Sequence, residues 1–198
     1  MKIINLFILV ALFLVACNPS TSNTESNNTK NYRNEDLGWT IPIPTIYQAL
    51  SKAELEALYR KEQILIGKMV GNENARKLHR KYLVNFQRNS QNRFQSAIEQ
   101  ISELNKDISY SKMDQIAVNL YNKQNAKIDT LAGEETVDGV LFHTFAVKVH
   151  MFFGLRSANH IFYRTKLKGY YLTVIMISNN EKDRDLLLTT FRNSEFNE

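Results

Sequence analysis

Residues 134–149 contain the pattern that most restricts the fold, because apolar side chains alternate with polar ones on both sides of Asp138-Gly139. Successive side chains of a strand point to opposite faces of a sheet, so a period of two predicts strands. An Asp-Gly pair between two such segments is the strongest short signal for a β-hairpin. The segments 134–137 and 140–149 are therefore expected to pair as antiparallel strands.

A second predicted hairpin follows, with the segments 161–167 and 170–178 on either side of a tight turn at Lys168-Gly169. The last segment is apolar on both faces, which is typical of a strand that is covered on both sides. We therefore expect it to be central in the sheet. Met151 to Asn159, between the two hairpins, is expected to form a long loop.

The rest of the chain adds shorter strands and three helices. Residues 38–44 place Trp39, Ile41 and Ile43 on one face, and two prolines indicate an edge strand. A capping box at Ser51-Lys52-Ala53-Glu54 opens a helix to Ile66. Further expected elements are a basic helical extension over 74–81, strands over 82–86 and 94–98 with a turn at 89–92, a helix opening at Ser111 to Asp114, and a last helix capped by Asn179-Asn180-Glu181.

The predicted order is strand, helix, two strands, helix, four strands, helix. Runs of hairpins with helices between them favour an α+β fold in which helices pack on an antiparallel sheet. We expect about six strands with helices on both faces. Residues 36–198 are expected to form this single domain, which is large enough to bury a core of its own.

The same order resembles a known family. The opening Gly38-Trp39-Thr40-Ile41-Pro42-Ile43-Pro44, the meander with Lys168-Gly169-Tyr170-Tyr171-Leu172-Thr173 and the final helix ending in Thr190-Phe191 look like the PsbP family. That fold also serves a Ran-binding nuclear import factor. The resemblance covers residues 36–196 and implies a PsbP-like αβα sandwich. It also implies an accessory, assembly or scaffold role without shared catalytic residues. The helix at 51–66 and its basic extension depart from the family's pattern.

The amino terminus reads as an export signal. Met1-Lys2 precedes an apolar run too short to span a bilayer, since a spanning helix needs roughly 20 apolar residues. Leu14-Val15-Ala16-Cys17 resembles the lipobox of bacterial lipoproteins, which implies cleavage after residue 16 and acyl chains on Cys17. Each buried methylene contributes about 0.8 kcal/mol to such an anchor. The alternative is an uncleaved membrane helix with an incidental cysteine.

Residues 17–35 are expected to form the lipidated cysteine and a disordered tether, because Asn, Ser and Thr dominate them. The expected location is the extracytoplasmic side of a bacterial cell envelope, on the outer membrane facing the periplasm. The expected partners are the lipid bilayer, through acylated Cys17, and another envelope protein. Nucleic acid is not an expected partner of a protein tethered outside the cytoplasm.

Cys17 is the only cysteine, so the sequence excludes disulfides within the chain and sites built from several thiolates. The formal net charge is +5, and its densest patch runs from Arg76 to Lys81. This patch has two interpretations, contact with anionic lipid headgroups or a solvated helix end, of which we favour the second. No nucleophile elbow, phosphate loop or dinucleotide loop is present, and we expect no cofactor.

Histidines are the remaining candidates for chemistry. They are His79, His143, His150 and His160, without the spacing of a metalloprotease. His143 is expected to be a hydrogen-bonded core residue. His150 and His160 flank the predicted long loop, so with Glu134 or Glu135 they would form a zinc or copper site if the strands brought them together. Chance proximity is the favoured interpretation, and we expect no metal site.

The predicted loop carries the apolar residues Phe152, Phe153 and Leu155, which either fold back as a flap or form a partner-binding patch. Three functions remain open. The leading hypothesis is a non-enzymatic, membrane-anchored binding or assembly module. The alternatives are a hydrolase or metal-dependent enzyme using the His150/His160 region, and a carrier for a small apolar ligand, which requires a cavity.

Overall fold

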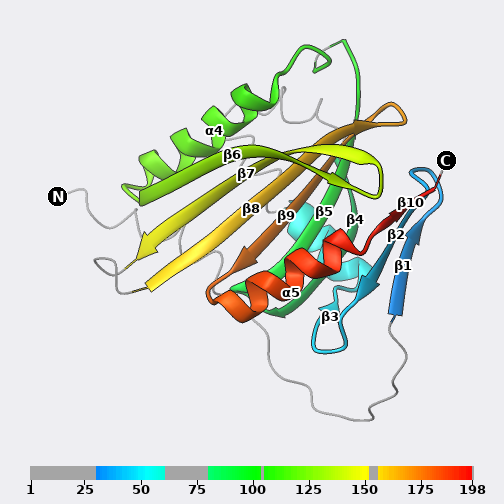
Figure 1. Cartoon of the computed structure of the whole chain (residues 1–198), viewed down its shortest axis with the longest axis horizontal. Coiled ribbons are helices and arrows are strands. Elements are labelled where there is room, and N and C mark those ends of the chain that lie inside the picture. Colours follow the sequence, from blue (N-terminus) through cyan, green and yellow to red (C-terminus); the bar gives the residue numbers. More distant parts are fainter. Residues whose placement is uncertain (1–29, 61–79, 104, 152–155, 198) are drawn as a thin grey trace.

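Two antiparallel sheets organise the fold (Figure 1). The structure is a computed structural model that describes residues 30–60, 80–103, 105–151 and 156–197. The larger sheet has the order β3-β4-β5-β9-β8-β7-β6, and the smaller has the order β1-β2-β10. The strands are β1 (Lys30–Asn34), β2 (Trp39–Ile43), β3 (Gln48–Ala49), β4 (Arg80–Asn89), β5 (Asn92–Gln100), β6 (Lys127–Val137), β7 (Val140–Met151), β8 (Arg156–Leu167), β9 (Tyr170–Ser178) and β10 (Glu195–Phe196).

The predicted meander forms strands β6 to β9, which are successive neighbours in the seven-stranded sheet. Both predicted turns are two-residue hairpin loops with positive φ at each position, 45° and 79° at Asp138-Gly139 and 48° and 82° at Lys168-Gly169. β9 lies between β5 and β8, so its predicted central position is confirmed. The α+β class with antiparallel sheets is confirmed, but the described residues form ten strands in two sheets in place of the expected single sheet of about six.

The predicted long loop at 151–159 is wrong. β7 continues to Met151 and β8 begins at Arg156, and these two residues pair with each other. The ladder then continues through His150 and Ser157. Most of the expected loop is therefore strand, because the β7–β8 ladder extends past the point where the apolar alternation fades.

The expected edge strand, β2, is the middle strand of the small sheet. β10 pairs only with Trp39 and Thr40, so Pro42 lies beyond the part of β2 that has partners on both sides. Residues 30–34, which the sequence assigns to the tether, form β1 and pair with β2 along its full length. The small sheet thus includes residues that precede the expected boundary at residue 36.

Three helical segments are described, and each begins at a polar cap. Residues 52–60 follow the predicted capping box, in which the Ser51 amide donates to Glu54 Oε2 over 2.7 Å. Helix α4 (Tyr110–Lys123) is capped by Ser109, two residues before the expected start, and α5 (Glu181–Arg192) is capped by Asn180 as predicted. Of the expected basic helical extension, Arg80 and Lys81 belong to β4, and 61–79 lie outside the described residues.

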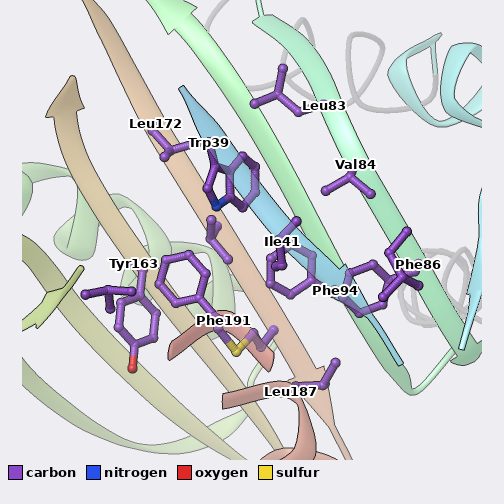
Figure 2. Close-up of a cluster of buried hydrophobic side chains, with 14 of the residues drawn as sticks. Trp39, Ile41, Leu83, Val84, Phe86, Phe94, Tyr163, Leu172, Leu187 and Phe191 are labelled. Carbon is purple, nitrogen blue, oxygen red and sulfur yellow. The ribbon is translucent and has the colours of Figure 1, made fainter. Parts of the chain in front are cut away.

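Side chains on the two faces of β7 contact different helices. Phe142 packs against Phe191 of α5, with ring centroids 5.3 Å apart, whereas Phe145 belongs to a cluster with Ala117 and Tyr121 of α4. Neighbouring strand positions point to opposite faces, so α4 and α5 cover opposite faces of the large sheet. Figure 2 shows the main core on the α5 side, where Trp39 and Ile41 of the small sheet meet the large sheet.

The predicted core positions are largely correct. Trp39, Phe145 and Val147 are buried, while Ile175, on the α4 face of β9, is only half-buried. Trp39 stacks on Phe196 of β10 at 6.0 Å, so the carboxyl end of the chain completes this core. Gly38 permits that closure, since a Cβ there would lie 2.0 Å from the Asn197 carbonyl oxygen.

Candidate functional site

A hollow of about 280 Å³ opens between the small sheet, β3, β4 and the helix at 52–60. We call it the β1–β4 hollow. Its walls are mainly aliphatic, with two amides, one phenol and one ammonium group at their edges. The lining residues are Lys30, Asn31, Tyr32, Ile43, Ala49, Leu50, Leu55, Leu83, Val84 and Asn85.

An irregular stretch of β4 shapes one wall of the hollow. The β4–β5 register shifts between Tyr82 and Asn85, which is the mark of a β-bulge. Ser96 on β5 holds this bulge, because its hydroxyl accepts from the Val84 amide over 3.0 Å and donates to the Val84 carbonyl over 2.7 Å. In Figure 2, Leu83 and Val84 both project from the same side of β4. The bulge thus brings two successive aliphatic side chains to the hollow.

The opposite wall begins where the chain leaves β3. The Leu50 amide donates to the Asn85 carbonyl over 2.8 Å, which fixes Leu50 beside β4. The capping box at Ser51 then starts the helix, and Leu55 lies in its first turn, half-buried. The Leu50 hydrogen bond and the capping box therefore place both leucines at the hollow.

Asn85 is the most unusual polar residue of the lining. It is buried, and its Oδ1 accepts from the Ser96 amide over 2.9 Å. Its Nδ2 has no hydrogen-bond partner among the described residues. The described lining contains no carboxylate and no imidazole. The hollow is therefore suited to binding an apolar group, and this lining lacks the carboxylate and imidazole groups that most often act as general acids and bases.

His150 and His160 lie on opposite faces of the sheet. His160 pairs with Val147, which faces α4, and His150 is three positions further along β7. His150 bonds to Asp129 Oδ2 over 2.7 Å, and His160 bonds to the Tyr121 hydroxyl. Burial lowers the pKa of His160 to about 4. The suggested shared metal site is wrong, and the described residues contain no cluster of three or more metal-ligating side chains.

His143 has the expected hydrogen bond, and its partner is Asp114 of α4. Asp114 Oδ2 lies 2.7 Å from His143 Nε2, and its Oδ1 accepts from the Arg164 guanidinium on β8. Tyr110 stacks on the imidazole at 5.1 Å. Burial lowers the pKa of Arg164, and Asp114 opposes that shift. All these groups are paired, so the cluster serves to hold α4 on the β7–β8 face.

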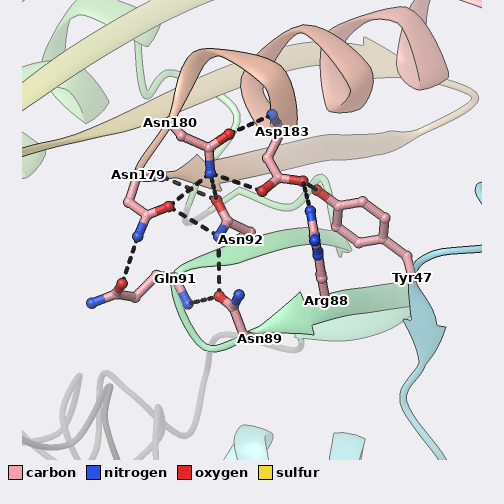
Figure 3. Close-up of polar contacts among 8 residues, drawn as sticks. All are labelled: Tyr47, Arg88, Asn89, Gln91, Asn92, Asn179, Asn180 and Asp183. Carbon is pink, nitrogen blue, oxygen red and sulfur yellow. Dashed lines mark hydrogen bonds and ion pairs between the residues drawn. The ribbon is translucent and has the colours of Figure 1, made fainter.

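A second polar cluster joins the start of α5 to the β4–β5 turn (Figure 3). Asn92 Nδ2 donates to Asn179 Oδ1 over 3.0 Å, and its Oδ1 accepts from the Asn179 amide over 3.1 Å. Asp183 accepts from Tyr47, Arg88 and Asn180. Burial acts to raise the pKa of Asp183, but hydrogen bonds from Asn180 and Tyr47, together with Arg88, bring that pKa below its ordinary value. The cluster fixes helix α5 against the sheet.

Other predicted site residues lie outside the described part of the chain. These are Cys17 and the candidate partner-binding residues Phe152, Phe153 and Leu155. Glu135 is not near either histidine site, because it binds Tyr163 over 2.7 Å and Arg192 over 2.6 Å. Among the described residues, no helix has both the length and the apolar character needed to cross a membrane.

Comparison with known proteins bears on the fold. No protein-family model matches the sequence, and no curated protein does. Among solved structures, the chain is similar to the solution structure of cyanobacterial PsbP (CyanoP) from Synechocystis sp. PCC 6803, with a TM-score of 0.54 and 11% identity. The match covers 90% of this chain and 98% of that one. The fold is PsbP-like.

The PsbP-like fold agrees with the family resemblance of residues 36–196. The hollow adds what the sequence pattern did not reveal. Its wall at Leu55 belongs to the helix that departs from the PsbP pattern, and its wall at Lys30 to Tyr32 belongs to the expected tether. Tyr32, the one aromatic residue just before Trp39, was the available signal, because a lone aromatic side chain in a polar segment indicates packing.

Proposed function

We propose that this chain is a lipid-anchored, extracytoplasmic binding or assembly module without enzymatic activity. In this proposal the β1–β4 hollow receives an apolar side chain or short apolar segment of another envelope protein. The observation that carries the proposal is the mainly aliphatic lining of the hollow, whose described residues include no carboxylate and no imidazole. An apolar pocket with a few polar groups at its edge is a common form of binding site.

The position of the hollow relative to the proposed anchor supports this role. Lys30, which lines the hollow, is separated from Cys17 by thirteen peptide steps along the sequence, 17 to 30. An extended chain covers roughly 3.3–3.6 Å per residue, so this stretch reaches at most about 47 Å. A module with acyl chains on Cys17, as Leu14-Val15-Ala16-Cys17 indicates, would therefore present its hollow close to the membrane surface. Partners in or on the same membrane are the natural occupants.

The anchor is tested first. Cys17→Ser removes the sulfur that would carry the diacylglycerol, and the chain should lose acyl labelling and appear in the soluble fraction. Cells grown with a tagged palmitate analogue report the labelling, and fractionation reports the release. Labelling that persists in Cys17→Ser would contradict the anchor, whereas the binding role of the hollow would remain to be judged by the next experiment.

The hollow is tested by photocrosslinking in intact cells. A benzophenone amino acid replaces Ala49, an exposed residue of the hollow's rim, and in a control strain it replaces Leu141, which is 55% exposed on β7. We expect a discrete envelope-protein adduct from position 49 alone. Leu55→Glu places a charge on the wall and should abolish the adduct, while Ala57→Glu, on the same helix but outside the lining, should keep it. Equal adducts from positions 49 and 141 would refute the proposal.

The hollow also favours the carrier alternative, which requires a cavity. If the occupant is a small apolar molecule, native mass spectrometry of the purified protein should show a bound mass of a few hundred daltons. That mass should disappear in Leu55→Glu and persist in Ala57→Glu. An unliganded mass together with a position-49 adduct would favour the protein partner, and the absence of both would contradict binding in the hollow.

A further inference from the structure

β6 is an edge strand with no strand partner on its outer side among the described residues. Its residues from Asp129 to Glu134 are all exposed, and Leu131 is 74% exposed, the highest value among the exposed large apolar side chains of the described residues. Edge strands of soluble proteins are usually short, bulged, or protected by proline and lysine, because free backbone groups attract other strands. β6 has eleven residues paired to β7 without a register shift, contains no proline, and carries its single lysine at its end, Lys127.

Helix α4 does not shield this edge. Its Asp114 reaches His143 on β7 and Arg164 on β8, and its Tyr121 reaches His160 on β8. These contacts, and the packing of Ile128 in the same cluster as Ala117 and Tyr121, place α4 on one face of the sheet, whereas the outward backbone groups of β6 lie in the plane of the sheet. Among the described residues, no strand pairs with the backbone groups of β6 that point away from β7.

The hairpin turn determines which backbone groups are open. A two-residue loop at Asp138-Gly139 makes Val137 and Val140 a hydrogen-bonded pair, and such pairs alternate along an antiparallel ladder. Leu131 and Gly133 therefore bond to β7. Thr130 and Ala132 point their N–H and C=O groups outward.

We propose that two copies of the chain pair through their β6 edges, antiparallel, with Leu131 of one copy opposite Leu131 of the second copy. In this register Thr130 exchanges hydrogen bonds with Ala132 of the second copy, so the open groups on both edges are satisfied. Leu131 meets its copy at a position without ladder hydrogen bonds, where side chains approach most closely. Each exposed Leu131 side chain is thereby covered by Leu131 of the second copy.

The charged side chains of β6 favour this register over the registers that are shifted by two residues. It places Lys127 opposite Glu135 of the second copy and Asp129 opposite Gly133, so no like charges meet. A shift by two residues in one direction places Asp129 opposite Glu135, and opposed like charges destabilise a sheet. A shift in the other direction places Asp129 opposite Leu131. A partner of the same sequence therefore fits this edge in one register.

Cysteine substitution tests the register directly, because Cys17 is the only native cysteine. Facing residues without ladder bonds have Cα atoms about 4.5 Å apart, which suits a disulfide. Leu131→Cys in the full chain, oxidised in membranes, should give a covalent homodimer. Glu134→Cys should not, because its copy would lie six residues along the paired strand, about 20 Å away. The unsubstituted chain reports any disulfide formed by Cys17 itself.

A proline pair provides the second test. Ala132→Pro removes an outward N–H but no bond to β7, and it should abolish the Leu131→Cys crosslink. Thr136→Pro also changes an outward position but lies outside the paired stretch, so the crosslink should persist. Sedimentation of the detergent-extracted wild type should show a reversible dimer that Ala132→Pro weakens by about tenfold or more. No crosslink at position 131, an equal one at 134, or a monomeric wild type would overturn the proposal.

Discussion

The Tyr47 hydroxyl donates a hydrogen bond to Asp183 Oδ1 over 3.1 Å, linking the segment before β3 to the first turn of α5. The two residues are far apart in sequence, and each belongs to a different layer. Tyr47 also packs edge-on against Phe86, with ring centroids 5.6 Å apart. One side chain thus contributes both to the main core and to the polar cluster that holds α5.

Tyr47→Phe separates these two contributions, because it keeps the ring and removes the hydroxyl. A hydrogen bond to a charged group contributes roughly 1.5–3 kcal/mol, and Asp183 retains other donors, so we expect a loss of about 1–2 kcal/mol in the free energy of unfolding. Urea denaturation measures it. Tyr170→Phe is the matched control, since no hydrogen bond of the Tyr170 hydroxyl is found among the described residues. Equal losses in both variants would contradict the assigned role.

The Asp183 carboxylate should make the free energy of unfolding depend on pH. Its pKa in the folded state lies below the ordinary value, so its contribution is fully present above the unfolded pKa, near 3.9, and is lost as the pH falls through the lower folded value. Asp183→Asn should therefore be less stable than the wild type at pH 6, and the difference should narrow below about pH 4. Urea midpoints of the wild type and Asp183→Asn, measured at pH 6 and below about pH 4, show whether the difference in stability narrows. A difference that grows on acidification would be inconsistent with a carboxylate stabilised by its donors.

Asp114 should be the more sensitive acidic residue, because it neutralises Arg164 under α4. Both are buried, with 8% and 6% exposure, and removal of one partner leaves an unpaired buried charge. We expect Asp114→Ala to cost about 3–5 kcal/mol. Arg164→Met in the Asp114→Ala background should recover part of that loss, since the remaining charge is then gone. A double variant less stable than Asp114→Ala, measured by urea denaturation, would argue against this pairing.

How much of the fold the sequence predicts depends on how local each signal is. The hairpin at Asp138-Gly139 and the helix cap at Asn180 are local, and both are found where the sequence places them. β1 has no such signal, because Lys30 to Asn34 is polar around Tyr32 and becomes a strand only by pairing with β2. β3 and β10 are two residues each, too short for any periodicity to appear.

The candidate site was less predictable for a related reason. The bulge that shapes the hollow depends on Ser96, a strand away from the Val84 backbone that it binds, and no pattern within β4 reveals that contact. The hypothesis of a shared His150/His160 site is wrong because the two side chains point to opposite faces of the sheet. Once Met151 pairs with Arg156, His160 lies opposite Val147, and an offset of three places the two imidazoles on different faces. A loop length misjudged by a few residues was enough to obscure this.

His160 provides a test of the α4 face. The imidazole is buried against the Tyr121 hydroxyl, and burial lowers its pKa to about 4, whereas an unfolded histidine titrates near 6.5. Between these values the unfolded chain binds the extra proton, so the stability of the wild type should rise as the pH increases from 4 to 6.5 and level off above it. The two pKa values imply a contribution of at most about 3–4 kcal/mol to the free energy of unfolding. His160→Gln keeps a partner for Tyr121 but cannot titrate, so its urea midpoint should vary less over this range. If His160→Gln keeps the full pH dependence, the imidazole is not buried as a neutral ring between α4 and the sheet.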